Sequence, residues 1–517
     1  MKYMTRFLIV SILSLLPFAA NAFGSAANIS ITQSGTAVGN CTTNVQTPAF
    51  FNNAANWGSG TSQIGPGTTV LICGTFTGAA GATEFQFNGS GASGSPITLK
   101  FDSNAVLTAP YWSSNGAIYC SGNQYIVIDG GTNGLIQNTA NGTSLTYHQA
   151  SFGVNGQNCP NTTVKNLTVS NIYINQGSSS NATDIAGLNT ADINFAGTST
   201  GVVITGNTVS SAKIGISVSA DPSADASNVT VSNNTISDMD WGITVSGGDS
   251  GDTMTNILIS GNTITNWTNW QFPTDTYHQD GVIVYNQGST NLETVTFTNN
   301  YIYGDLGVGS PTGFIYCSTS TSCQFYNNLL VNTGHNIYGI VWINNPNCGN
   351  HLYNNTIVGL SGDFGLTIGN LTCPQSLGTM VVENNIFSGP NVGINDYGSL
   401  TADVSVSNYN VFRNAGGSAP SMSTNDGTYL TWSTWTGNGF DASSNSNAPN
   451  LNGSYKIASA SGGAYQTATN LTSLGLSALN KDKAGSARPA SGAWDMGAYE
   501  FTTAVPSPTG LTGTVVP

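Results

Sequence analysis

The sequence predicts an all-β solenoid, in which short strands wind into coils that stack along one axis. Charged residues make up only 7% of the chain and 63 of its 517 residues are glycine, a composition that favours turns over amphipathic helices. Similar strand openings recur: Asn207, Asn234 and Asn262 are 27 and 28 residues apart (234 − 207 and 262 − 234). Such a period without helices describes a coil of three short strands.

The repeat has two recognisable steps. Its opening pairs a Gly or Asn with a marker asparagine; we expect the markers to stack as a ladder bonded through their side-chain amides. Its ending reads x-Gly-Ile-x-Val, as in Gly215 to Val218. Short strands bury enough surface only through inward apolar columns. We therefore expect these residues to point inward: Ile216, Val218, Ile243, Val245, Val282, Val284 and Ile340.

The chain divides into five segments. Residues 1–22 predict a cleaved signal peptide, because Lys2 and Arg6 precede a short apolar run and Ala20-Asn21-Ala22 forms a cleavage site. The protein is therefore expected outside the cytoplasm, secreted or periplasmic. The remaining segments are an N-terminal cap with the first coils (23–116), a β-helix (117–412), a C-terminal coil or cap (413–503) and a linker-like tail (504–517).

Eight cysteines in an exported chain predict disulfides rather than metal sites. Spacing alone does not fix their pairing. The expected pairs are Cys348–Cys373 from repeat register, Cys317–Cys323 as a short-loop staple and, by proximity, Cys41–Cys73 and Cys120–Cys159.

The formal charge of −14 becomes −16 when Lys2 and Arg6 leave with the signal peptide. Nucleic acids and anionic membranes both require basic patches, so neither is expected as a partner. No arginine lies between Arg6 and Arg413, which removes the arginine forks that grip sugar carboxylates. Neutral glycans, or acidic ones bridged by calcium, fit this composition better.

The end of the chain carries a recognisable motif. Asp482-x-x-Gly485-x-x-Arg488-Pro489 is followed by the run Trp494 to Glu500. With the repeated steps and the strand Tyr125 to Gly131, this ending resembles secreted bacterial right-handed parallel β-helix proteins of the pectate-lyase-like superfamily. The resemblance implies a right-handed parallel β-helix and an extracellular polysaccharide as partner. The superfamily includes lyases, hydrolases, epimerases, tailspikes and adhesins, so it does not specify the reaction.

The longest coil, from Asn262 to Asn300, spans 38 residues (300 − 262). Extra residues in a solenoid leave the core as loops, often on the binding face. Where this coil has Asp280, we align an apolar residue in other coils: Ile214, Trp241, Tyr338 and Phe364. Adjacent strands lie about 4.8 Å apart, which would bring acids, bases and aromatic rings into one patch. The candidate catalytic residues are Asp280, His278, Asp240, Asp238, Tyr277 and Lys213, and the candidate substrate-binding residues are Trp267, Trp270, Phe272, Gln279 and Trp241.

Two reactions suit this patch. A hydrolase would use two carboxyl groups, about 5 Å apart for retention or about 6.5 to 9.5 Å for inversion. The step Gln279 to Val282 resembles the Asn-Thr-Asp-Gly step of polygalacturonases, which implies a catalytic Asp280. A lyase would use Tyr277 and His278 as acid and base, or Lys213 as base, with calcium held by some of Asp238, Asp240 and Asp280.

Competing interpretations remain. Asp280 could serve only to cap the turn before Gly281, and the protein could be a non-catalytic surface or adhesive protein that binds glycan through its Trp-rich loop. For an enzyme, we expect Asp280 on the outer surface at a groove edge. A carboxylate of Asp238 or Asp240 and the ring of His278 or Tyr277 would lie within one coil spacing.

Overall fold

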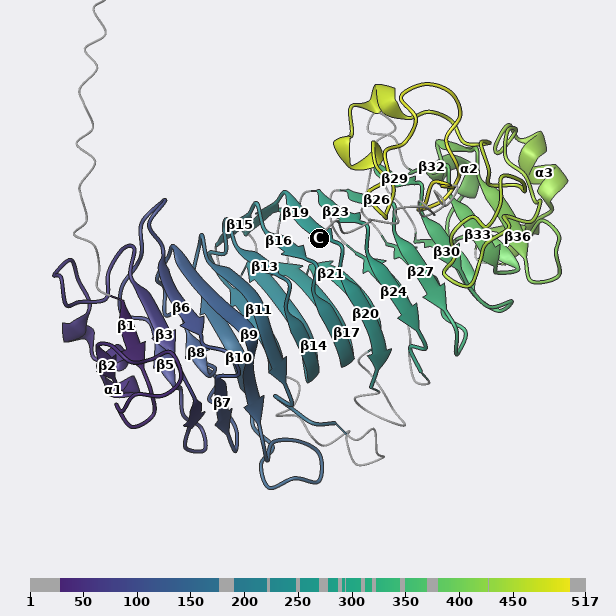
Figure 1. Ribbon diagram of the computed structural model, residues 1–517. Coiled ribbons are helices and arrows are strands. Elements are labelled where there is room, and N and C mark those ends of the chain that lie inside the picture. The colour runs from purple at the N-terminus through teal and green to yellow at the C-terminus, as the bar shows by residue number, and fades with distance from the viewer. Residues whose placement is uncertain are drawn as a thin grey trace, which may run out of the picture.

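The computed structural model describes residues 28–175, 190–220, 224–247, 252–268, 278–286, 291–292, 294–307, 312–318, 322–344, 349–369, 380–425 and 427–502. In these ranges the chain forms the predicted right-handed parallel β-helix, an elongated stack of strands (Figure 1). Each full coil contributes one strand to each of three sheets, which we call sheets 1, 2 and 3.

Sheet 1 carries the candidate site. It contains β5 (Phe85–Gln86), β8 (Ile118–Tyr119), β10 (Ser151–Gln157), β12 (Thr190–Ala196), the C-terminal parts of β14 (Thr208–Ala220) and β17 (Thr235–Gly247), β21 (Asp280–Asn286), β25 (Gly313–Cys317), β28 (Val341–Ile343), β31 (Phe364–Ile368), β34 (Val392–Asp396) and β37 (Ser421–Thr424), which pairs antiparallel with β38 (Thr428–Leu430).

Sheets 2 and 3 complete the coils. Sheet 2 contains β1 (Ile29–Ile31), β3 (Thr69–Ile72), β6 (Ile97–Phe101), the N-terminal parts of β9 (Ile126–Asn138) and β11 (Thr163–Ser170), β13 (Val203–Thr205), β16 (Thr230–Ser232), β19 (Ile257–Ser260), β23 (Val295–Thr298), β26 (Cys323–Tyr326), β29 (Asn350–Tyr353), β32 (Met380–Glu383) and β35 (Val406–Asn408); β2 (Val45–Gln46) pairs with β1. Sheet 3 contains β4 (Thr75–Thr77), β7 (Val106–Ala109), the remaining parts of β9, β11, β14 and β17, β20 (Thr263–Trp267), β24 (Tyr301–Gly304), β27 (Leu329–Asn332), β30 (Thr356–Val358), β33 (Ile386–Gly389) and β36 (Val411–Asn414). A small separate sheet joins β15 (Asp225–Ser227), β18 (Thr253–Thr255) and β22 (Asn291–Leu292).

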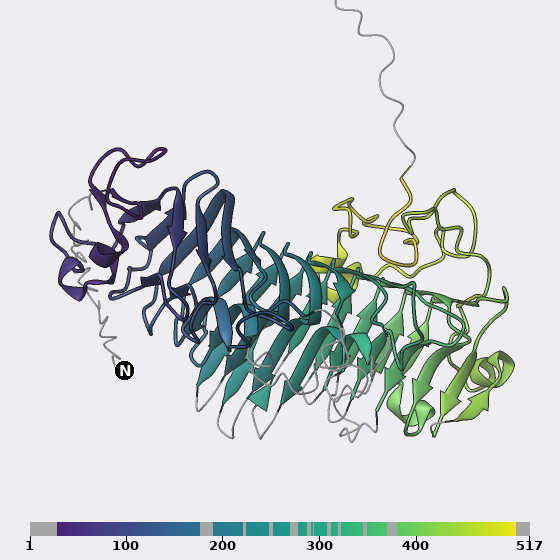
Figure 2. The same cartoon turned by 90° about the horizontal axis from the view of Figure 1, so that it is seen from below.

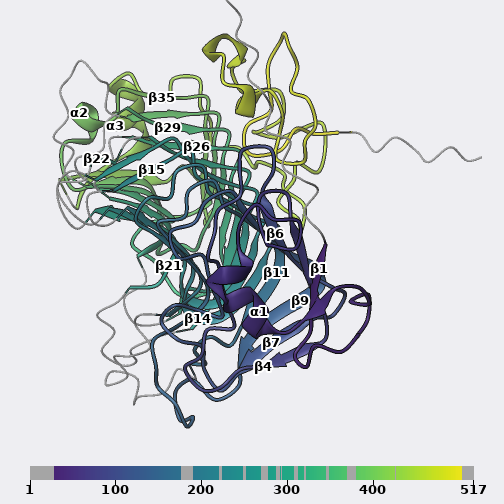
Figure 3. The same cartoon turned by 90° about the vertical axis from the view of Figure 1, so that its left-hand side faces the viewer.

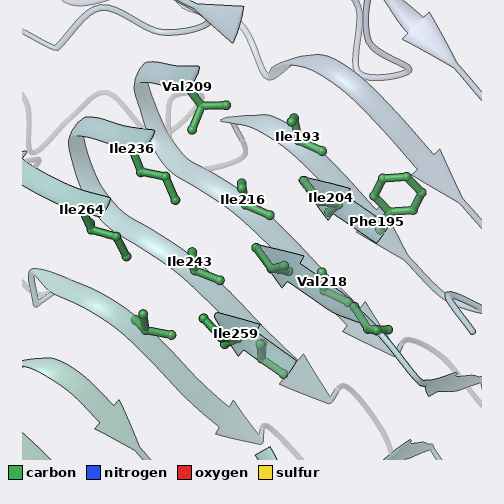
Figure 4. Packing of buried hydrophobic residues seen from close by; sticks show 14 of the residues in the cluster. Ile193, Phe195, Ile204, Val209, Ile216, Val218, Ile236, Ile243, Ile259 and Ile264 are labelled. Atoms are coloured by element: carbon green, nitrogen blue, oxygen red, sulfur yellow. The ribbon is translucent and has the colours of Figure 1, made fainter. Parts of the chain in front are cut away.

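The interior is filled by stacked apolar columns, seen in Figure 4. Ile216 pairs with Ile243, and Ile243 with Val282 in the next coil. All seven residues predicted to point inward are completely buried: Ile216, Val218, Ile243, Val245, Val282, Val284 and Ile340. Their predicted burial is confirmed. Ile340, however, stands outside the column of Ile243 and Val282, because Val341 is the residue that pairs with Ile315 and Leu366 there.

The predicted asparagine ladder is also confirmed. Asn234 Nδ2 donates to Asn262 Oδ1 at 3.0 Å, and the same bond recurs from Asn207 to Asn410. The residue before each marker turns the corner with a positive φ, 55° at Asn233 and 67° at Gly206. Asn and Gly adopt this left-handed conformation most readily, which explains the Asn-Asn and Gly-Asn pairs of the repeat.

Irregular elements flank the coils. The short helix α1 (Pro48–Asn52) lies over the N-terminal end of the stack (Figure 3), where Phe51 packs edge-on against Trp57, Phe85 and Phe87. Helices α2 (Leu400–Asp403) and α3 (Trp432–Gly437) follow the last coils. The 3-10 turns are Ala54–Asn56, Thr472–Leu474 and Ser477–Leu479. The five segment boundaries stay a prediction.

The segment 439–502, which we call the C-terminal arm, folds back beside β26 and β29 (Figure 1); Figure 2 shows it alongside the stack from a second direction. Its closing motif binds the coil corners. Arg488 Nη2 donates to Asn327 Oδ1 at 2.9 Å, and Gly497 N donates to the Asn384 carbonyl at 2.7 Å. The motif identified in the sequence is thus one of the parts that fasten the arm.

Three of the four expected disulfides are present: Cys41–Cys73, Cys120–Cys159 and Cys317–Cys323. Cys348 and Cys373 lie outside the described residues, as does the predicted signal peptide. Across the described ranges, no helix is long and apolar enough to cross a membrane.

Candidate functional site

The candidate site lies where the strands of sheet 1 begin. Trp241 of β17 is level with Asp280 of β21, and Asp280 is level with Gly313 of β25. This register confirms that an apolar residue precedes Asp280 in its column. The alignment with Tyr338 was wrong by one residue, because Ile315 pairs with Val341 and so places Gly339 level with Gly313.

Asp280 is completely buried, so the prediction that it lies on the outer surface was wrong. Its burial is compatible with folding because the carboxylate has partners: His278 Nδ1 lies 2.5 Å from Oδ2, and the Thr312 hydroxyl donates to Oδ1. Burial raises the pKa of Asp280, while the hydrogen bonds from His278 and Thr312 oppose that rise. The predicted proximity of His278 is confirmed.

His278 connects the buried carboxylate to the surface, since its side chain is 30% exposed. Its ring centroid lies 6.1 Å from Trp241 and 5.7 Å from Tyr316, edge-on to the latter. The Trp241 indole N–H donates to the His278 carbonyl at 2.5 Å. The His278 imidazole is therefore held by its contact with Asp280, by the bond between its backbone carbonyl and Trp241, and by the neighbouring rings of Trp241 and Tyr316.

Lys213 and Asp240 form an ion pair in the adjoining coils, with both side chains almost fully buried. Lys213 Nζ also lies 4.6 Å from the centroid of the Trp241 ring, a cation–π geometry. Proton abstraction by Lys213, or proton donation by Asp240, would require this pair to separate. In the observed arrangement the pair supports Trp241.

Asp238 lies apart from this pair. It is exposed at the left-handed corner of β17, with φ of 58°. The carboxylates of Asp240 and Asp280 are committed to Lys213, His278 and Thr312, and within the described residues no three His, Cys, Asp or Glu side chains converge on a metal site. The geometry of these residues therefore does not fit a calcium ion, the cation that the lyase alternative would use.

The predicted substrate-binding residues divide into two groups. Trp241 is half-buried beside His278, whereas Trp267 stacks on Phe314 at 5.4 Å and donates from its indole N–H to the Asp280 carbonyl at 3.0 Å. Gln279 is fully buried. Trp267 and Gln279 therefore pack under the site and are not placed to contact a substrate. Tyr277, Trp270 and Phe272 lie outside the described residues.

The sequence analysis missed an aromatic band on the outer face of sheet 1. Tyr316 and Trp342 occupy equivalent positions in successive coils, with ring centroids 5.2 Å apart. Trp342 in turn stacks near Tyr397 at 6.2 Å. We define the aromatic band as Trp241, Tyr316, Trp342 and Tyr397; His278 lies between its first two members. An alignment of the second x of x-Gly-Ile-x-Val, in the register that the strands adopt, would have revealed the pair Tyr316 and Trp342.

No model of a protein family matches the chain, and no curated protein matches it. Solved structures that resemble it include a native GH136 lacto-N-biosidase from Eubacterium ramulus, with 12% identity, a TM-score of 0.47, and coverage of 70% of this chain and 63% of that one. The chain thus spans less than two thirds of that protein.

Two lyases show a weaker likeness. One is a mannuronic acid specific polysaccharide family 6 lyase from human gut microbiota, with 10% identity, a TM-score of 0.39, and coverage of 76% of this chain and 89% of that one. The other is an alginate lyase from Paenibacillus sp., with 14% identity, a TM-score of 0.29, and coverage of 72% and 95% respectively. At these values the likeness supports no inference about activity, which must come from the site itself.

Proposed function

We propose that this protein cleaves an extracellular polysaccharide lying along sheet 1, with His278 as the residue that transfers a proton. The observation that carries the proposal is the His278–Asp280 pair, a partly exposed imidazole on a buried carboxylate, set between the rings of Trp241 and Tyr316. The predicted signal peptide and the disulfides support an extracellular location.

Each part of the site has a chemical role in this proposal. The Asp280 carboxylate accepts a hydrogen bond from Nδ1–H of His278. This bond selects the tautomer in which the other ring nitrogen, Nε2, exchanges the proton with a substrate. The aromatic band offers flat apolar faces to the C–H faces of sugar rings. Its members lie along the solenoid axis, a direction that suits an extended polymer.

Two reactions remain within this proposal. In hydrolysis, water adds across the broken glycosidic C–O bond and the leaving oxygen gains a proton. In β-elimination, a base removes the proton beside a uronate carboxyl group, the C–O bond breaks and a double bond forms. The commitment of Lys213 to Asp240 leaves that cation less suited to neutralising a uronate, which favours hydrolysis of an uncharged glycan.

One observation favours a second function, glycan binding without cleavage. Both Asp240 and Asp280 are buried and paired, whereas a glycosidase uses two carboxyl groups that reach the substrate. An aromatic band is sufficient for binding alone.

A single experiment separates these functions. The purified chain is incubated with plant, algal and bacterial polysaccharides, with and without calcium, while reducing ends and ultraviolet absorbance are recorded. New reducing ends without absorbance mean hydrolysis, and both signals together mean elimination. Binding without either signal supports the non-catalytic function and contradicts the proposed enzyme.

The site is then tested by Asp280→Asn and His278→Gln. The amide introduced by Asp280→Asn would keep the shape but donate toward Nδ1 and reverse the tautomer, so we expect kcat/KM to fall about 10²- to 10⁴-fold. Melting curves should be unchanged. The matched control is His335→Gln, since His335 is exposed and pairs with Asp305 elsewhere. Activity of Asp280→Asn at the parent rate would remove His278 and Asp280 from the mechanism.

A further inference from the structure

A hollow lies on the outer face of sheet 2, on strands that take no part in the aromatic band. Its volume is about 430 Å³, and it is formed by β23, β26, β29 and the C-terminal arm. Its lining includes Thr296, Gln324, Tyr326, His351, Tyr353, Leu474 and Leu476. Such a volume is within the range of small-ligand sites in proteins.

The floor consists of one polar and one aromatic row, fixed by strand register. Thr296 pairs with Gln324 and Gln324 with His351, while Tyr326 pairs with Tyr353 in the neighbouring row. The two tyrosine rings are nearly parallel, with an interplanar angle of 12° and centroids 5.9 Å apart. His351 stacks on Tyr353 at 5.3 Å. Hydrogen-bonding groups and flat faces therefore alternate across the floor.

The C-terminal arm supplies an apolar wall. Leu474 ends the turn Thr472–Leu474 and is 45% exposed, so its side chain is accessible to a ligand in the hollow. This wall is held in place, because the Asn327 side chain donates to the carbonyls of Ala478 and Lys481, each at 2.9 Å. The hollow is thus built between anchored elements.

The lining is uncharged. Burial lowers the pKa of His351 and so favours the neutral imidazole, and burial raises the pKa of Tyr353 to about 12. Glu383 pairs with Tyr353 in the next coil. A carboxyl group at this position disfavours anionic ligands. Within the described part of the chain, no hydrogen bond joins the His351 ring to another group, and its nitrogens can serve a ligand.

We infer that this hollow is a second carbohydrate-binding site, which takes one or two uncharged sugar units by stacking on His351 and Tyr353 beneath the wall of Leu474 and Leu476. The Thr296 hydroxyl flanks the place where sugar hydroxyls would lie. Beside it, the Gln324 side chain donates to the Gly349 carbonyl and accepts from the Tyr326 hydroxyl, each at 2.8 Å, and so fixes the floor. The inference extends beyond the proposed function, since this site needs no chemistry. A glycan held here would raise the effective concentration of its other segments at sheet 1.

Imidazole NMR tests the inference directly, because the chain has only four histidines: His148, His278, His335 and His351. The probes are the methyl glycosides of glucose, galactose, mannose and xylose, with methyl glucuronide as the charged comparator. We expect saturable shifts at His351 with at least one neutral glycoside and none with the glucuronide. Signals of His335 should not move.

Variants show whether the shifts come from the hollow. His351→Ala should weaken binding about tenfold or more, and Leu474→Ala severalfold, both measured by saturation-transfer NMR. Tyr429→Ala is the control, since Tyr429 is also a large exposed side chain, 59% exposed, but lies on β38 and not at the hollow. Shifts at His278 alone would overturn this inference while leaving the proposed function intact. No shift at His351 with any neutral glycoside, or shifts with the glucuronide alone, would overturn it too.

Discussion

Replacing the buried Asn234 by alanine should destabilise the solenoid far more than replacing its exposed neighbour Thr235. The Asn234 side chain makes four bonds: Oδ1 accepts from the backbone and side chain of Asn207, and Nδ2 donates to the Ile204 carbonyl and to Asn262 Oδ1, all at 3.0 Å. Without it, the buried backbone N–H of Asn207 loses its partner.

The magnitude follows from these four bonds. A buried donor without a partner costs about 1–3 kcal/mol, and each of the other three bonds contributes about 0.5–1.5 kcal/mol. Asn234→Ala should therefore cost about 4 kcal/mol, a large share of the stability of a typical domain.

The assay is the urea midpoint or melting temperature of Asn234→Ala, measured beside Thr235→Ala. Thr235 is the adjacent residue but is exposed, so its replacement should cost less than about 0.5 kcal/mol. Equal destabilisation by the two variants would refute the view that the asparagine ladder satisfies the turn backbone.

Three further predictions concern other regions. Burial and the nearby Asp403 carboxyl raise the pKa of Asp396 to about 7. The protonated Asp396 therefore stabilises the folded state, and this contribution is complete below the unfolded pKa of about 4. It is lost as the pH rises through 7, which lowers the free energy of unfolding by at most about 4 kcal/mol. Asp396→Asn should flatten that decline in melts at pH 5 and pH 8, and a slope that persists would contradict it. Trp342→Ala should raise KM about 3- to 10-fold with kcat unchanged; unchanged KM would exclude the aromatic band from binding. Arg488→Met should release the C-terminal arm to limited proteolysis, as Arg488 bonds Asn327 and Glu500; equal resistance of variant and parent would contradict this role.

Much of the fold could be predicted because the repeat places chemically constrained residues at fixed intervals. Positions such as Asn233 require a left-handed corner, and residues such as Ile243 and Val245 require an interior. These demands are local or periodic, so one sequence is sufficient to reveal them.

The site was less predictable because it depends on register between coils. Asp280 was recognised as an unusual residue in its column, but its burial depends on Thr312, which is 32 residues away. The misplacement of Tyr338 by one position shows the difficulty, since a one-residue shift exchanges inward and outward side chains. Trp342, two residues beyond the misaligned Ile340, was overlooked for that reason.

The attachment of the C-terminal arm has a consequence for how the solenoid opens. Stacked coils contact only their neighbours, so such arrays ordinarily fray from their ends. Here one segment bonds four successive corners, at Asn299, Asn327, Asn354 and Asn384. No one of these coils can peel away without breaking contacts that span the others. The arm thus couples this end of the molecule into a single cooperative unit, one that is complete only after the last residues of the arm have been made.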